Sequence, residues 1–363
     1  MVVASGDAGT AAGIDAGWIP PSPMSSAPPR ERAQGRTAGR SRIGTDAEAV
    51  YVSPVSDSPP AGAVARLAAW RRTRPRTPPL TRRTVVARGL PFAVWSTPEV
   101  PGATPLLAIN GGMIYGHDLL WPALAPLADG RQLILYDQRG RGETPAPPGT
   151  RAARIEHDIL DIVALREALG ITAWDLVGHS WGGGMALLAA AEDATGVRRV
   201  VTFDAVGATS RWLDALHDRA LAHLAARDLS TRYAALAALD PLALHDPEPT
   251  RHVVYSRTMY PAWFHDPRML AQAPPEAHSP HGATVVARLR REGFDWRDRF
   301  AAIRAPVLLI HGTEDALPIA EAEANAALIA GARVVAIPEA GHMPFFENPE
   351  PTFGAALAFL DAP

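Results

Sequence analysis

The chain has 363 residues, of which 47% are hydrophobic and 20% are charged, which is ordinary for a soluble globular enzyme. A formal net charge of −3 gives no general attraction to nucleic acid or to an anionic membrane, so we expect a small molecule or short peptide as partner. Cysteine is absent, which excludes disulfide bonds, thiolate metal sites and a cysteine nucleophile. All 35 basic residues are arginine, which excludes Schiff-base and serine–lysine mechanisms.

No segment of the sequence has the character of a membrane span or a secretion signal. Apolar runs are shorter than the roughly 18 residues that a span requires. The arginine pairs at residues 71–72 and 82–83 are not followed by the hydrophobic stretch of a twin-arginine signal. We therefore expect a cytoplasmic protein with no membrane partner.

The first 83 residues differ in composition from the rest of the chain. Residues 1–60 are rich in Gly, Ala, Ser and Pro and have few large apolar side chains, so they cannot bury enough surface to offset ordering entropy. This composition predicts a disordered N-terminal tail. Residues 61–83 are rich in Pro and Arg and predict a solvated linker, with contact to an acidic partner as the alternative.

From Thr84 onwards, short apolar segments alternate with amphipathic ones. This pattern predicts an α/β fold with a mostly parallel, doubly wound sheet. A hairpin is expected over residues 84–95. Buried strands are predicted at residues 105–110, 132–137, 174–178, 197–203, 306–311 and 333–337. Helices are predicted at residues 155–169, 181–191, 320–329 and 352–360.

The alternation stops over residues 208–303, where the sequence is helical in character and rich in Ala, His and Arg. A structureless loop of that length would be improbable in a compact domain, so we predict an inserted helical cap. Residues 84–207 and 304–363 would then form the two parts of the core. The cap would lie over the carboxyl ends of the strands, where such sheets bind their ligands.

Residues 178–182 read Gly-His-Ser-Trp-Gly and lie between a predicted strand and a predicted helix. A serine on such a sharp turn has strained backbone angles, so its neighbours Gly178 and Gly182 must be small. The turn would expose the Ser180 hydroxyl at a helix N-terminus, whose dipole favours developing negative charge. The alternative is a glycine-rich turn with an unreactive serine. The strand and helix around the motif favour Ser180 as a nucleophile, with His179 as pocket wall.

An acid and a base should follow two later strands, in the chain order serine, acid, histidine. Asp315 follows the predicted strand at 306–311, and its Gly-x-x-Asp spacing favours it over the neighbouring Glu314. His342 lies in the loop after the last predicted strand. A neutral His342 would take the proton of Ser180, while Asp315 would hold the histidine tautomer and stabilise the imidazolium.

Acyl transfer also needs donors for a tetrahedral oxyanion, and these are usually backbone amides. We expect one from Trp181, the residue after the nucleophile, and one from Gly112 in the loop after the first core strand; a plain glycine turn is the alternative there. Residues 137–139 (Asp-Gln-Arg) are interpreted as supports of the active-site loops. No cofactor is expected and no metal, because the cap histidines lack the spacing of a ligand motif.

With these residues, the chain resembles the proline iminopeptidase branch of the α/β-hydrolases, a family of serine aminopeptidases with a helical cap. The resemblance covers residues 84–361. The Asp-Gln-Arg-Gly and Ser-Trp-Gly-Gly elements are the most diagnostic. The resemblance implies the α/β-hydrolase fold and cleavage of an amide or ester through an acyl-enzyme. Its carriers are residues 110–112 (Asn-Gly-Gly), 136–142 (Tyr-Asp-Gln-Arg-Gly-Arg-Gly), 178–183 (Gly-His-Ser-Trp-Gly-Gly), 312–315 (Gly-Thr-Glu-Asp) and 341–342 (Gly-His).

The chain departs from the family pattern in the oxyanion loop, where the usual His-Gly-Gly-Pro-Gly becomes Asn-Gly-Gly-Met-Ile at residues 110–114. An aminopeptidase must also hold a cationic amine. The cap has acidic residues, and the sequence singles out none of them for that role rather than for a solvated helix face: Asp214, Asp218, Glu248, Glu276 and Glu292. A carboxylesterase or lactonase with the same triad therefore stays open, as does a non-catalytic binding protein. Candidate substrate-binding residues, each of which could equally pack in the core, are Met113, His179, Trp212 and Tyr260, with Tyr115 and Trp263 as further aromatic candidates.

Overall fold

The structure is a computed structural model that describes residues 50–51, 62–74, 76–226, 258–273 and 277–363. The disordered tail predicted for residues 1–60 lies outside these ranges except for β1 (Val50–Tyr51), which is a strand rather than part of such a tail. It pairs in parallel with β9 (Arg333–Ile337) and so supplies hydrogen-bond partners to the outer edge of that strand.

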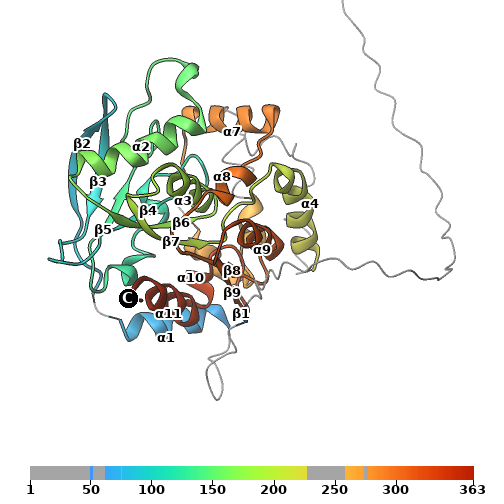
Figure 1. The fold of residues 1–363 in the computed structure, drawn as a ribbon. Coiled ribbons are helices and arrows are strands. Elements are labelled where there is room, and N and C mark those ends of the chain that lie inside the picture. The colour runs from blue at the N-terminus through green and yellow to red at the C-terminus, as the bar shows by residue number, and fades with distance from the viewer. Residues whose placement is uncertain (1–49, 52–61, 75, 227–257, 274–276) are drawn as a thin grey trace, which may run out of the picture. The chain divides into compact units, whose positions relative to one another are not determined.

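A nine-stranded sheet runs through the described residues, in the order β1-β9-β8-β7-β6-β4-β5-β3-β2 (Figure 1). The predicted hairpin is confirmed as an antiparallel pair, and β3 also pairs antiparallel with β5. All other pairings are parallel, which confirms the mostly parallel α/β sheet. The remaining strands are β2 (Thr81–Ala87), β3 (Leu90–Ser96), β4 (Leu106–Ile109), β5 (Leu133–Tyr136), β6 (Trp174–His179), β7 (Val197–Phe203) and β8 (Val307–Gly312).

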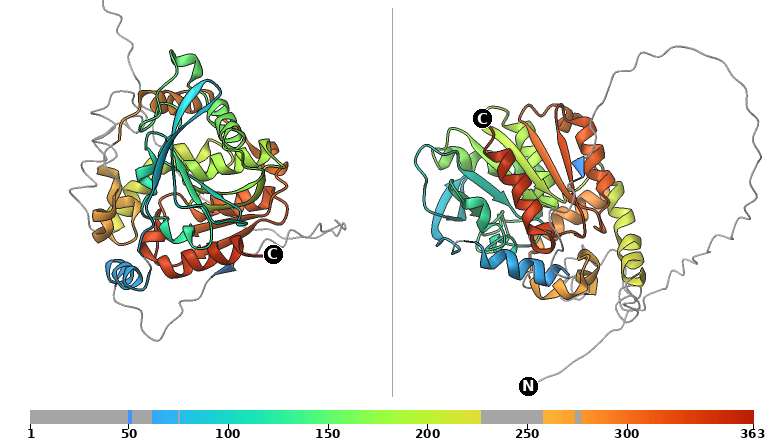
Figure 2. Two further views of the ribbon diagram at one scale, coloured as in Figure 1. Left: turned by 90° about the vertical axis from the view of Figure 1, so that its left-hand side faces the viewer. Right: turned by 90° about the horizontal axis from the view of Figure 1, so that it is seen from below.

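Alternate residues of the central strands enter two separate hydrophobic cores. In β4, Leu107 and Ile109 belong to the core under α2 (Ile155–Ala168), while Leu106 and Ala108 belong to the core on the opposite face. Figure 2 shows helices on both faces of the sheet, as the doubly wound prediction requires. Helices α3 (Trp181–Glu192) and α9 (Ile319–Leu328) lie on the first face, and α11 (Pro349–Leu360) lies on the second. A strand that is buried on both faces favours apolar residues throughout, as in β4.

The linker predicted at residues 61–83 is wrong for most of its length. It contains helix α1 (Ala63–Arg72), in which Ala63 and Leu67 are buried, and it overlaps β2, which begins at Thr81. Trp70 stacks on Phe353 of α11 with ring centroids 5.7 Å apart. The spacing of Ala63, Leu67 and Trp70 places them on one face of the helix. The Pro- and Arg-rich composition of the segment led to the prediction of a linker instead.

The described parts of residues 208–303 are helical, and residues 227–257 and 274–276 of the predicted cap lie outside them. Each helix of the described ranges is too short or too polar to cross a membrane. The helical segments are α4 (Arg211–Ala226), residues 258–263, η5 (Pro267–Gln272), α7 (Pro280–Glu292) and α8 (Arg297–Ala301).

Candidate active site

Ser180 lies on a strained turn between β6 and α3. Its φ of 55° and ψ of −119° are unusual for a residue with a side chain. A Cβ atom on Gly178 would lie 2.2 Å from the carbonyl oxygen of Gly182, and one on Gly182 would lie 2.0 Å from that of Ile109. The side chain of Ser180 makes no capping hydrogen bond to α3. The two glycines therefore permit the turn, and the helix does not consume the serine hydroxyl.

His342 and Asp315 form a buried pair across two loops. The Nδ1 atom of His342 lies 2.7 Å from Oδ2 of Asp315, whose Oδ1 accepts a hydrogen bond from the amide of Leu317 at 3.0 Å. Asp315 is 2% exposed, whereas Glu314 is exposed to solvent. Of the two neighbouring carboxylates, Asp315 is thus the one that orients the imidazole.

Two neighbours hold the His342 loop in place. The amide of His342 donates to the carbonyl of Trp263 at 2.7 Å, and the two rings lie with centroids 4.2 Å apart. His179 donates from Nε2 to the carbonyl of His342 at 2.8 Å. His179 therefore lines the pocket, as predicted, and also supports the backbone of the residue predicted as base.

Burial lowers the pKa of the His342 imidazole to about 3, and burial together with the neighbouring His342 lowers the pKa of His179 to about 3. Both rings are therefore neutral at neutral pH. The bond to Asp315 assigns the single ring proton of His342 to Nδ1, because a carboxylate can only accept. The Nε2 atom of His342 is then free of a proton, which is the form that a general base requires.

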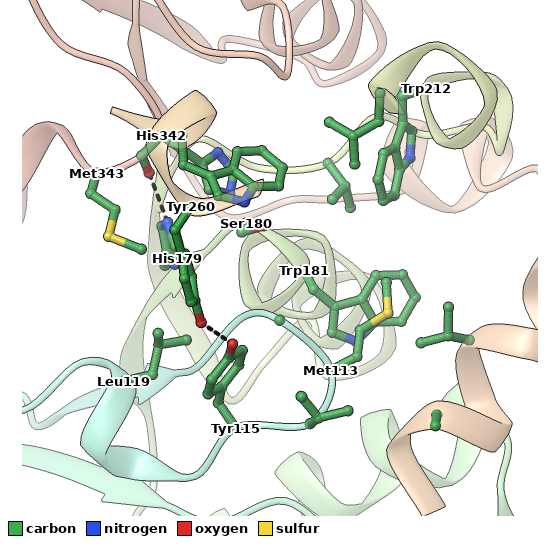
Figure 3. A pocket seen from close by; sticks show the side chains of 17 residues that line it. Met113, Tyr115, Leu119, His179, Ser180, Trp181, Trp212, Tyr260, His342 and Met343 are labelled. Atoms are coloured by element: carbon green, nitrogen blue, oxygen red, sulfur yellow. Dashed lines mark hydrogen bonds between the residues drawn. The ribbon is translucent and has the colours of Figure 1, made fainter. Parts of the chain in front are cut away.

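Ser180 and His342 line one pocket together with Gly112 and Trp181 (Figure 3). The four predicted substrate-binding residues, Met113, His179, Trp212 and Tyr260, also line it, as do Tyr115 and Trp263. No hydrogen bond joins Ser180 to His342 among the described residues, so the structure gives a shared pocket rather than a closed relay. Sequence reasoning missed the aliphatic lining, which no motif marks: Ile114, Leu119, Val206, Leu216, Ala283, Val286 and Met343.

The phenol groups of Tyr115 and Tyr260 contact each other across this pocket (Figure 3). Burial and the facing phenol raise the pKa of Tyr260. The Tyr260 hydroxyl therefore stays protonated and can share a hydrogen bond with that of Tyr115. The contact links the loop that carries Gly112 to the helical segment at residues 258–263.

The loop that carries Gly112 is fixed by side chains from the Asp-Gln-Arg-Gly-Arg region. Gln138 donates to the carbonyl of Asn110 at 2.9 Å, and Arg141 donates from Nε to the carbonyl of Met113 at 2.8 Å. Gly112 has a φ of 67°, a conformation that favours glycine. Within the described residues, no backbone hydrogen bond uses the amide of Gly112 or Trp181. Both amides remain available as oxyanion donors.

Residues 137–139 are interpreted from the sequence as supports of the active-site loops. Asp137 accepts a hydrogen bond from the amide of His117 at 2.7 Å, and Arg139 forms an ion pair with Asp161. Arg141 of the same motif, to which no role was assigned from the sequence, bonds both carboxylate oxygens of Asp158 at 3.0 and 3.2 Å. This buried ion pair connects helix α2 to the oxyanion loop. The second Arg-Gly of the motif is the only sequence signal for it.

A further acidic residue, Asp204, lies next to Asp315 and was missed as well. One oxygen of each carboxylate and a ring nitrogen of His311 all lie within 4.8 Å of one another, a spacing that could suit a metal ion. However, Nε2 of His311 donates to the carbonyl of Leu317 at 2.8 Å, and Oδ2 of Asp315 is bonded to His342. These atoms are thus already engaged in hydrogen bonds.

Comparison with known proteins agrees with this architecture. A profile of the α/β hydrolase fold matches residues 104–349. A proline iminopeptidase of Lactobacillus delbrueckii subsp. bulgaricus is 25% identical over 294 residues, which cover 73% of this chain and 94% of that protein.

Two solved structures show the same fold. The proline iminopeptidase of Mycobacterium smegmatis has a TM-score of 0.56 at 22% identity and covers 77% of this chain and 97% of its own. The enol-lactonase of Burkholderia xenovorans LB400 has a TM-score of 0.60 at 22% identity and covers 77% of this chain and 100% of its own. At this identity the likeness concerns the fold alone. The profile match spans more than half of the sequence, and the chain therefore belongs to the α/β-hydrolase family, with similarity to proline iminopeptidases.

Proposed function

We propose that the chain is a serine hydrolase that cleaves an amide or ester bond through an acyl-Ser180 intermediate. The observation that carries this proposal is the 2.7 Å bond from His342 to Asp315 at the edge of the pocket that also holds Ser180. A neutral imidazole oriented by a buried carboxylate, in one pocket with a strained and uncapped serine, supplies the groups that activate a hydroxyl.

The reaction would proceed in two halves. His342 Nε2 accepts the Ser180 proton as the hydroxyl attacks the scissile carbonyl, and the amides of Gly112 and Trp181 stabilise the oxyanion. The protonated His342 then gives its proton to the leaving amine or alcohol. Water attacks the acyl-enzyme with His342 again as base, which releases the acid and restores Ser180.

Similarity to proline iminopeptidases supports an aminopeptidase acting on short peptides as the first choice of substrate. The pocket offers aromatic surfaces from Trp212, Tyr260 and Trp263 against which an apolar pyrrolidine ring could pack. Such a substrate also presents a cationic amine, which needs a carboxylate partner in the pocket.

The lining of the pocket favours an esterase or lactonase as the second candidate. Its described members are aromatic, aliphatic and glycine residues, with the neutral His179 and His342 and the hydroxyl groups of Ser180, Tyr115 and Tyr260. Such walls bind an uncharged acyl group without desolvating a charge. None of the described lining residues carries a carboxylate to receive an amine.

Parallel assays on proline-naphthylamide and short p-nitrophenyl esters separate the two substrates. Wild-type protein, Ser180→Ala and the control Ser210→Ala are compared, with fluorophosphonate labelling of Ser180 as a substrate-independent readout. Cleavage of esters alone would exclude the aminopeptidase. Absence of labelling in folded wild-type protein, with both substrates untouched, would exclude the serine hydrolase and favour a binding protein.

A further inference from the structure

Asp204 and Asp315 form a buried carboxylate pair at the carboxyl ends of the neighbouring strands β7 and β8. Asp204 is 0% exposed and Asp315 is 2% exposed. Asp204 has a φ of 49°, and its amide donates to the carbonyl of Ile310 at 2.9 Å. Its Oδ1 accepts from the amide of Gly312 at 2.8 Å. The backbone thus fixes Asp204 against the loop that carries Asp315.

The surroundings of the carboxylate pair do not supply two positive charges. His311 is buried, and burial lowers its pKa to about 4, so its ring is neutral. Arg219 donates to the carbonyls of Asp315 and Ala316, at 3.3 and 2.6 Å, rather than to a carboxylate. Glu347 also acts on Asp204 through its negative charge, and His342 is neutral. Two adjacent buried carboxylates in such surroundings cannot both ionise.

The hydrogen bonds indicate which member of the pair holds the negative charge. Asp315 receives hydrogen bonds from Leu317 and from His342, and Arg219 lies nearby. Asp204 receives one from Gly312, while its Oδ2 receives none from any of the described groups. Donors stabilise the anion on Asp315 more than on Asp204.

We propose that Asp204 is a neutral carboxylic acid that donates a hydrogen bond to the Asp315 carboxylate, so that the acid of the triad is a pair sharing a single negative charge. The inference rests on the proposed function. Burial raises the pKa of both carboxyl groups, and the facing Asp315 raises that of Asp204 further, whereas hydrogen bonds from Leu317 and Asp204 act to lower the pKa of Asp315. Asp204 is thus a positioning residue that keeps Asp315 ionised and aimed at His342.

The proton balance of the reaction follows from this assignment. The Asp204 proton stays on Asp204 throughout, while the Ser180 proton moves to His342 and then to the leaving group. The imidazolium that forms faces one anion rather than two or none. With two anions the resting His342 would be drawn toward the protonated form, and with none its tautomer would be lost.

Infrared spectroscopy of the full chain tests the pair through the carbonyl stretch of a protonated carboxyl group at neutral pH. Wild-type protein should show this band and Asp204→Asn should lack it. The matched control is Asp175→Asn, which removes a buried aspartate of β6 whose two oxygens accept hydrogen bonds from Arg198, a cation that opposes the rise in its pKa caused by burial. This control should keep the band. A band that persists in Asp204→Asn, or is lost in Asp175→Asn, would overturn the assignment.

Kinetics on the best substrate of the two assays gives the second readout. Because asparagine is neutral and still donates, Asp204→Asn should keep kcat/KM within about threefold, whereas Asp204→Ala should lose about tenfold, equivalent to one hydrogen bond to a charged group. If Asp204→Asn loses as much activity as Asp315→Asn, Asp204 carries the charge and the proposal is wrong.

Two further measurements distinguish a failure of this proposal from a failure of the proposed serine hydrolase and from a bound metal ion. Fluorophosphonate labelling reports on the proposed function independently, since the infrared band does not depend on turnover. Metal analysis of the purified protein covers the other way of neutralising the pair. A stoichiometric divalent ion that is lost in Asp204→Asn would mean that a cation, not a proton, lies between the two carboxylates.

Discussion

The two halves of the candidate site are held by different kinds of contact. The nucleophile turn is fixed by close backbone approaches, to Gly182 at Gly178 and to Ile109 of β4 at Gly182, which leave no room for a side chain. The acid and base are fixed by side-chain hydrogen bonds between loops that are far apart in sequence, through Asp204, Asp315 and His342. A side chain added at either glycine would have to displace backbone, whereas a substitution in the acid and base half changes which atoms donate and accept hydrogen bonds.

The largest effect should come from Ser180→Ala, which removes the nucleophile and leaves the turn intact. We expect kcat to fall by about 10⁶-fold, as for other triad nucleophiles, without loss of thermal stability. Turnover and the melting temperature measured on the same sample check this expectation. Residual activity above about one per cent would show that Ser180 is not the nucleophile.

The next effect should come from Asp315→Asn, which keeps the shape but favours the wrong tautomer of His342. We expect a loss in kcat of about 10⁴-fold. Glu314→Gln is the matched control, since that carboxylate is exposed and should cost little. If both variants lose activity equally, the pairing of His342 with Asp315 does not operate in turnover.

Gly182→Ala probes the backbone half of the site. Its new Cβ would lie 2.0 Å from the Ile109 carbonyl, so the turn must shift, and we expect about 10²-fold less activity with about 1–3 kcal/mol less stability. Gly354→Ala in α11 is the control because nothing lies within 4 Å of its Cβ position. There the free energy of unfolding should rise by about 0.5–1 kcal/mol. Equal behaviour of the two variants would contradict the close approach.

The pH dependence of kcat/KM reports on the base. Because burial lowers the pKa of His342 to about 3, the ring stays neutral well below the ordinary histidine range. Activity should be lost as pH falls through the His342 pKa, and the acid limb should lie below about pH 6.5. An acid limb at or above that value would show that the Asp315 anion outweighs burial in setting the basicity of His342.

Stability should fall on acidification for the same physical reason. Burial lowers the pKa of His179 and His342 to about 3 and of His311 to about 4. Below about pH 6.5 the unfolded chain binds more protons than the folded one, so this stability is present above that pH and is lost as pH falls. Each ring contributes about 1.4 kcal/mol per pH unit crossed, and the raised pKa of Asp204 opposes one of the three rings because there the folded state holds the extra proton. Urea unfolding between neutral pH and about pH 5 measures the slope, and a flat profile would contradict it.

The features that could be predicted from sequence are those whose signal is local. The parallel strands are short and mostly apolar runs, and the Gly-His-Ser-Trp-Gly turn lies at the end of one of them in the sequence itself. Asp315 and His342 were predicted because each follows a late strand, and the structure places them 2.7 Å apart. The end of a strand can be recognised in the sequence. Adjacent parallel strands then bring the residues that follow them together at one edge of the sheet.

The features that could not be predicted depend on contacts across the fold. Asp204 follows β7 as any polar residue might, and only its position beside Asp315 distinguishes it. The aliphatic lining of the pocket comes from separate elements with no shared motif. Helix α1 was missed because the Pro- and Arg-rich composition outweighed the spacing of Ala63, Leu67 and Trp70. Trp70 stacks on Phe353 of α11, more than 250 residues away in the sequence.

The phenol contact between Tyr115 and Tyr260 has a consequence for selectivity. Tyr115 follows Gly112 closely on one loop, and Asn110 donates to the Tyr115 carbonyl, so the ring and the oxyanion amide belong to one short, constrained segment. An acyl group wide enough to part the two rings would displace that segment. Bulky substrates would therefore be discriminated against in the chemical step as well as in binding, with a lower kcat accompanying a higher KM.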